Sequence, residues 1–216
     1  MMIHDNGVGI FEKIKNDFNL EDRRHAILEL SKGKLTSDSS RHSGEGIFFT
    51  SRMFSSFIIS SLDYAFVKLD TTTREYLLEI EQPEKETPGT RVILRLSTNV
   101  SYTPKEIFDR YSDDDQRFSK TVVPLKLAKY EGEQLVSRSQ ARRILSRLER
   151  FSEVVLDFEG ISEIGQGFAD EMFRVYPSEH PEVHLFPTKA GQAVQDMIRH
   201  VNANATEGAQ MELPIS

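Results

Sequence analysis

The sequence lacks cysteine and tryptophan entirely among its 216 residues. The absence of cysteine excludes disulfide bonds, thiolate metal sites and cysteine nucleophiles, and it agrees with a reducing compartment. No apolar run reaches the ~18 residues that a membrane-spanning helix needs, which excludes a membrane protein. The first residues also lack the basic and apolar regions of a secretory signal peptide. These absences together predict a cytoplasmic protein.

Basic residues are fewer than acidic ones: the sequence has 27 basic and 34 acidic residues, which give a net charge of -7. This balance argues against a general nucleic-acid binder. What is present is ordinary for a folded protein, with 38% hydrophobic and 28% charged residues. At roughly 150 residues per domain, the length allows one large or two small domains.

The first half of the chain carries both helix and strand signals. Helical spacing of apolar residues predicts two helices between Phe11 and Leu30, and a third from Gly46 on which Phe49, Met53 and Phe57 form one stripe. Strands are predicted at 64–69, 75–81 and 90–96, with 81–89 as a hairpin connection. The pattern then loosens, and residues 98–118 are predicted to be a linker.

The second half alternates regularly between strands and helices. Strands are predicted at 121–127, 154–158 and 183–186, and helices at 139–151, at 168–176 and after Thr188, the expected cap of the last helix. This order predicts a small α/β layer with a mostly parallel sheet. Residues 202–216 are predicted to be a flexible tail.

Two glycine motifs stand immediately before predicted helices: Asp5-Asn6-Gly7-Val8-Gly9 and Ser43-Gly44-Glu45-Gly46. An aspartate can accept a hydrogen bond from an exocyclic amine, and glycines allow the backbone to approach a ligand. Glycines that open a helix present free N–H groups to phosphate. For either motif alone, a turn or a helix cap is the simpler interpretation.

Taken together and in this order, the motifs resemble the second half of the GHKL ATPase fold, over residues 5 to about 97. The resemblance implies that Asp5, Gly7 and Gly9 form the first glycine box, where the aspartate contacts adenine. It implies an ATP lid over residues 20–42. The nucleotide-binding residues that it implies are Asp5, Gly7, Gly9, Gly44 and Gly46. His42, at the end of the lid, is a further candidate for a phosphate contact, and an exposed or partly packed histidine is the simpler interpretation.

The sequence departs from that family in one important respect. The N box, a helix with the magnesium-binding asparagine and the general-base glutamate, should precede Asp5, and only four residues do. Without these groups the magnesium ion has no fixed position and no water is activated. We therefore expect ATP to bind weakly or not at all, expect no magnesium, and assign no catalytic residue and no metal site. The alternative is a GHKL-class ATPase or serine kinase whose N-terminal part is missing from this sequence.

The region from about 119 to 201 resembles the STAS-like modules known as DUF4325, which occur behind GHKL-type domains. Related STAS domains are anti-sigma-factor antagonists that are phosphorylated on a serine, but no hydroxyl stands at the matching place here. Gly165 and Gly167 are expected to leave a helix N-terminus open to an anion or a partner backbone. Ser137, Arg138 and Ser139 form either an anion cradle or a plain N-cap that precedes a solvated cationic face.

The sequence thus predicts an α/β protein with four parts: an α+β sandwich of partial GHKL type (1–97), a linker (98–118), a small STAS-like α/β domain (119–201) and a tail (202–216). The expected function is regulatory, through a protein partner and with impaired or absent ATP hydrolysis. A homodimer, or a partner that supplies the missing helix, is also expected at the N-terminal half, because the stripe of Phe49, Met53 and Phe57 would lack its covering helix. Nucleic acid and membrane are not expected as partners.

Overall fold

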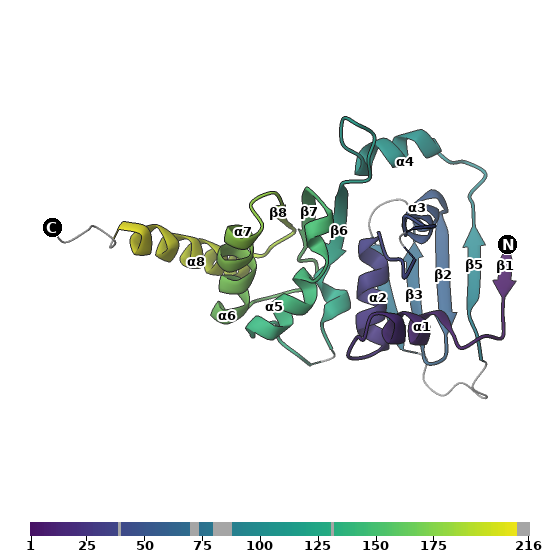
Figure 1. Ribbon diagram of the computed structural model, residues 1–216, viewed down its shortest axis with the longest axis horizontal. Helices are drawn as coiled ribbons and strands as arrows, with labels where there is room; N and C mark the ends of the chain where they lie inside the picture. The colour runs from purple at the N-terminus through teal and green to yellow at the C-terminus, as the bar shows by residue number, and fades with distance from the viewer. Residues whose placement is uncertain (39, 70–73, 80–87, 131, 211–216) are drawn as a thin grey trace. The chain divides into compact units, whose positions relative to one another are not determined.

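The computed structural model describes residues 1–38, 40–69, 74–79, 88–130 and 132–210. It divides the chain into two compact units, Met1–Ser119 and Lys120–Ser216. The first unit contains an antiparallel sheet and the second a parallel one, each accompanied by helices (Figure 1). The predicted α/β fold class is therefore confirmed.

The N-terminal unit is built on a five-stranded sheet in the order β1-β5-β2-β3-β4, in which all neighbouring strands are antiparallel. The strands are β1 (Met2–His4), β2 (Ser56–Ser61), β3 (Tyr64–Leu69), β4 (Arg74–Glu79) and β5 (Arg91–Arg95). Helices α1 (Ile10–Asp17), α2 (Arg23–Lys32) and α3 (Gly46–Met53) cover one face of this sheet (Figure 1). Phe57 and Ile59 of β2 are buried and supply part of the core.

The predicted helix from Gly46 to Phe57 is wrong in its second half. Helix α3 ends at Met53, and Phe57 lies in β2, which pairs with both β3 and β5. Burial in β2 follows a period of two, because alternate side chains of a strand point to opposite faces. Tertiary pairing has therefore overridden the helical spacing of Phe49, Met53 and Phe57. The predicted connection at 81–89 lies mostly outside the described residues.

The segment predicted as a linker, 98–118, contains helix α4 (Pro104–Tyr111). Thr103 and Glu106 form a capping box at its start, and Pro104 occupies the first turn, where no N–H is needed. Its aromatic side chains pack on α3: the ring centroids of Phe108 and Phe49 lie 4.2 Å apart. The segment therefore covers the helix for which the sequence showed no cover, which removes the reason for a dimer through that helix.

The C-terminal unit contains the predicted parallel sheet, in the order β6-β7-β8. Its elements are β6 (Lys120–Pro124), η1 (Leu125–Ala128), α5 (Arg138–Leu145), η2 (Leu148–Arg150), β7 (Glu153–Asp157), α6 (Gln166–Asp170), η3 (Glu171–Val175), α7 (Tyr176–Glu179), β8 (His184–Thr188) and α8 (Gln192–Gln210). Leu156, Phe158, Phe168 and Met172 are fully buried in its core.

Three boundaries in this unit differ from the prediction. The helix expected over 139–151 ends at Leu145, because Arg147 adopts a left-handed conformation with φ 65° and starts a separate turn. Thr188 ends β8 and does not cap α8, which begins at Gln192. Helix α8 continues to Gln210 through most of the predicted tail, and residues 211–216 lie outside the described part.

None of the helices in the described ranges has the length and apolar character needed to cross a bilayer.

Candidate functional site

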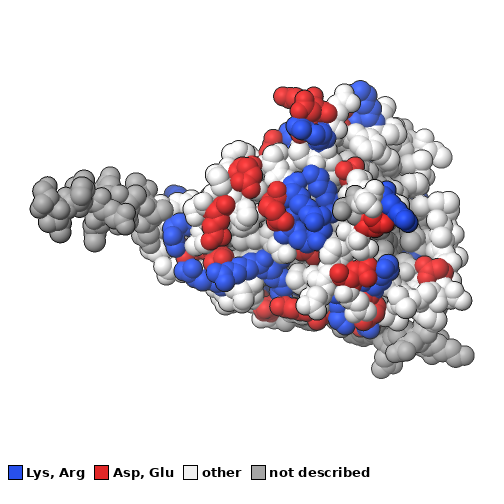
Figure 2. Space-filling model, in the orientation of Figure 1, with Lys and Arg blue, Asp and Glu red and all other residues white. Residues whose placement is uncertain are grey.

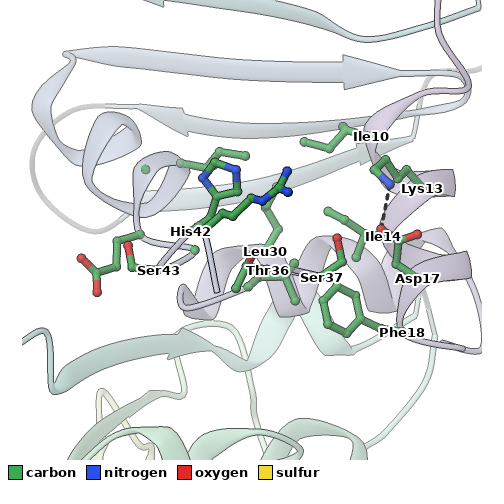
Figure 3. Close-up of a pocket in the computed structure, with 16 residues that line it drawn as sticks. Ile10, Lys13, Ile14, Asp17, Phe18, Leu30, Thr36, Ser37, His42 and Ser43 are labelled. Atoms are coloured by element: carbon green, nitrogen blue, oxygen red, sulfur yellow. Dashed lines mark hydrogen bonds and ion pairs between the residues drawn. The ribbon is translucent and has the colours of Figure 1, made fainter. Parts of the chain in front are cut away.

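A cavity of about 600 Å³ opens in the N-terminal unit between α1, the end of α2 and the loop that leads into α3 (Figure 3). Helix α1 supplies Ile10, Lys13, Ile14 and Asp17, which recur at the spacing of one helix face. The remaining lining residues are Phe18, Leu30, Leu35, Thr36, Ser37, Arg41, His42, Ser43, Gly44, Glu45, Gly46 and Ile47. One wall is therefore helical and the other is the predicted lid and second glycine motif.

Three of the six predicted nucleotide-binding residues line this cavity, namely His42, Gly44 and Gly46. Figure 3 shows His42 across the cavity from Ile10 and Lys13 of α1. The other three, Asp5, Gly7 and Gly9, are absent from the lining and precede the wall helix.

The first glycine motif anchors the start of α1 to Thr90, the residue that precedes strand β5. The Asp5 carboxylate accepts the backbone N–H of Gly7 at 2.8 Å and that of Thr90 at 3.2 Å. The Asp5 N–H donates to the Thr90 carbonyl at 3.0 Å, and the Thr90 hydroxyl accepts the N–H of Ile10 at 2.9 Å. Asp5 thus fixes the position of the cavity's helical wall while the residue itself is exposed.

Two cations line the cavity, and each has an acidic neighbour. The ammonium of Lys13 lies 2.9 Å from the carboxylate of Asp17, and the guanidinium of Arg41 lies 3.5 Å from that of Asp38. The hydrogen bond from Lys13, helped by one from Ser37, holds the pKa of the Asp17 carboxyl below its usual value. Asp17 is therefore ionised at neutral pH.

Sequence reasoning missed Lys13 and Asp17, although a signal was present. They lie four residues apart and alternate with Ile10 and Ile14 on one helical face. Helical spacing predicted the apolar side of α1, and the same spacing places these two charged residues beside it.

The second glycine motif forms the start of α3. Gly46 is the first helical residue, and Glu45 stands at the N-cap without accepting a side-chain capping bond. The first N–H groups of a helix have no partner within the helix and attract negative charge. The cavity thus borders a helix N-terminus that already has one carboxylate residue next to it. In the described residues, no group of three or more His, Asp or Glu side chains could hold a metal ion.

In the C-terminal unit, the predicted interaction residues have structural partners. Ser137 caps α5 through a capping box with Gln140, and its hydroxyl lies 3.0 Å from that of Ser139. At the start of α6, the N–H groups of the N-cap residue Gly165 and of Phe168 donate to the carbonyls of Leu135 and Val136, respectively. These N–H groups are therefore not available to an anion.

Close packing explains the glycines of this segment. A Cβ on Gly165 would lie 2.7 Å from the Cα of Val136, and one on Gly167 would lie 3.3 Å from the Val136 carbonyl oxygen. The glycines let the 135–136 segment run directly against the start of α6. This contact joins residues about thirty positions apart and leaves no local signal in the sequence.

The arginine face of α5 is paired and not simply solvated. Arg138 lies 2.6 Å from the Asp170 carboxylate, and Arg142 lies 2.6 Å from that of Glu171. Arg174 also pairs with Asp170, and this hydrogen bond, together with the charges of Arg174 and Arg138, lowers the pKa of the Asp170 carboxyl. Basic and acidic side chains are likewise interspersed on the face shown in Figure 2. Such pairing reduces the positive field that nucleic acid would require.

Comparison with known families finds one match in this unit. Residues 140–195, from α5 into the first turns of α8, match the family described as a STAS-like domain of unknown function (DUF4325). The match covers about a quarter of the chain and supports the predicted C-terminal module, but the comparisons give no evidence for the GHKL-type part. A search of curated proteins found no match.

Proposed function

We propose that the chain is a regulatory protein that binds a purine nucleotide weakly in the N-terminal cavity, does not hydrolyse it, and acts through a protein partner. The observation that carries this proposal is the cavity itself. It brings the second glycine motif, the lid segment and the helix that follows the first glycine motif to one place. The resemblance to the GHKL fold rests on these same motifs.

The cavity has the chemistry that such a ligand needs. Its volume lies within the usual range for small-molecule sites, about 300–1,000 Å³. Ile10, Ile14, Phe18 and Ile47 offer apolar contact to a base, and Thr36, Ser37 and Ser43 offer hydroxyl groups to a sugar. The start of α3 offers backbone N–H groups to a phosphate.

A matched pair of glycine variants tests whether the ligand occupies this cavity. Gly44 has φ +73°, and a Cβ there would lie 2.5 Å from the backbone nitrogen of Leu35, so Gly44→Ala must displace the loop. Gly132 has the same φ of +73° outside the cavity, and an added Cβ there would meet no atom within 4 Å, so Gly132→Ala is the control. In calorimetric titrations with ATP and ADP, we expect dissociation constants weaker than about 100 μM. Gly44→Ala should abolish the signal, and Gly132→Ala should retain it.

Three outcomes would contradict the proposal. Low-micromolar binding of Mg-ATP that is lost in Asp5→Ala would favour the alternative function, a GHKL-class ATPase or kinase with a functional nucleotide site. Equal binding by Gly44→Ala and the unchanged chain would place the ligand elsewhere. Measurable release of phosphate from ATP would disprove the absence of hydrolysis.

For the partner, we propose a second copy of the chain that pairs along the edge of β1. Met1 exchanges backbone hydrogen bonds with Leu94, and Asp5 bonds Thr90, so the alternate backbone groups of Met2 and His4 point away from β5. Met2 and Ile3 are 67% and 53% exposed. An exposed apolar edge strand is a surface on which another strand adds.

Light scattering tests this pairing. At tens of micromolar, we expect the mass of a dimer for the unchanged chain and of a monomer for Ile3→Lys, because a charge at the strand centre opposes pairing. The control is Val8→Lys, which adds the same charge at a residue that is 68% exposed and lies outside β1. A monomeric unchanged chain, or a monomer in both variants, would contradict pairing through this edge.

A further inference from the structure

The cavity that we assign to a nucleotide carries no net positive charge. Its charged lining residues in the described part of the chain are two cations, Lys13 and Arg41, and two anions, Asp17 and Glu45. A nucleoside triphosphate brings about four negative charges, whereas a nucleoside brings none. The net charge of the lining residues therefore affects whether a nucleoside or a nucleoside triphosphate binds more tightly.

Neither cation is free to serve a phosphate alone. The ammonium of Lys13 lies 2.9 Å from the carboxylate of Asp17, which is four residues later in the same helix. The guanidinium of Arg41 lies 3.5 Å from the carboxylate of Asp38 in the same loop. A phosphate that approaches Lys13 must share it with a carboxylate that stays ionised at neutral pH. Each additional phosphate charge would therefore add repulsion from Asp17.

The helix N-terminus beside the cavity offers limited compensation. Eight-residue α3 begins at Gly46, and its partial positive charge is adjacent to Glu45 at the N-cap. A carboxylate near a helix N-terminus is stabilised by the same dipole that would attract a phosphate. The apolar and hydroxyl-bearing lining is the larger part of the wall, and it contacts uncharged portions of a ligand.

We propose that this cavity takes a nucleoside or a nucleoside monophosphate and discriminates against the triphosphate. Asp17 is the residue that sets this preference, by neutralising Lys13 and repelling further phosphate charge. Lys13 contacts the single phosphate of a monophosphate. The inference rests on the proposed function, and it makes the site a sensor of low-charge purine compounds.

A charge series of probes tests the inference on the full chain. Adenosine, AMP, ADP and ATP are titrated by calorimetry at one ionic strength and without divalent cations. We expect adenosine and AMP to bind with similar affinity, and ATP to bind at least about tenfold more weakly, since repulsion grows with ligand charge. ATP binding that equals or exceeds AMP binding would overturn the inference and leave the proposed function intact. Failure of all four probes to bind would overturn both.

Two variants assign the preference to Asp17 and Lys13. Asp17→Asn should strengthen ATP binding by about tenfold and leave adenosine binding unchanged, because it removes one charge next to Lys13. The matched control is Asp114→Asn, which makes the same change in net charge at an exposed residue outside the lining and should alter neither affinity. Lys13→Gln should weaken AMP and spare adenosine. An unchanged ratio of ATP to adenosine affinity in Asp17→Asn, or equal weakening of both ligands in Lys13→Gln, would overturn the assignment.

Discussion

Replacing Phe48 with alanine is expected to destabilise the N-terminal unit by roughly 3–5 kcal/mol. Phe48 is 1% exposed, and its ring centroid lies 5.0 Å from that of Tyr111 and 4.5 Å from that of Phe118. The guanidinium carbon of Arg52 lies 3.4 Å from the same centroid. The substitution therefore opens a hole at the centre of the cluster and removes an aromatic contact from a buried arginine.

The measurement is urea unfolding of the full chain, followed by tyrosine fluorescence and circular dichroism. The control is Phe108→Ala in the same cluster, where the side chain is 42% exposed and the expected loss is about 1–2 kcal/mol. A loss for Phe48→Ala no greater than that for Phe108→Ala would contradict the packing. A negligible effect of Phe108→Ala would instead favour a linker over residues 98–118, as the sequence predicts.

The spacing of apolar residues predicts the elements whose buried side chains can be recognised within the element itself. The strand predicted at 64–69 coincides with β3, and the three strands of the parallel sheet were all found within a few residues of their bounds. Strand β2 was missed because three of its six residues are serine and because Phe57 continues the helical spacing of Phe49 and Met53. Which period applies there depends on pairing with β3 and β5, which the local sequence does not contain.

In the candidate site, too, features set by the local sequence could be predicted, and features set by distant residues could not. The second glycine motif could be predicted from the sequence, because glycines that open a helix are recognisable from local order. The roles of Gly165 and Gly167 could not, since they depend on Val136, a residue of another segment. No local pattern indicated that Asp5 would bond Thr90, which lies 85 positions away.

The largest effect on the first glycine motif is expected from Gly89→Ala. Gly89 has φ +94°, and a Cβ there would lie 2.0 Å from the carbonyl oxygen of Asp5 and 2.8 Å from the Cα of Asn6. Both neighbours are backbone atoms, which cannot rotate away as the end of a side chain can. A left-handed conformation costs a non-glycine residue about 1–2 kcal/mol. Overpacking adds about 1–3 kcal/mol, so we expect a total loss of about 2–5 kcal/mol.

The control for this variant is Gly160→Ala, which isolates the cost of the conformation. Gly160 has φ +81° but no atom within 4 Å of an added Cβ, so only the smaller backbone term of about 1–2 kcal/mol applies. Urea unfolding measures both variants. Gly89→Ala should also weaken binding in the cavity, because the Asp5–Thr90 contact that positions α1 is displaced. If Gly89→Ala costs no more than Gly160→Ala, Asp5 is not held against this turn, and the first glycine motif does not fix the cavity wall.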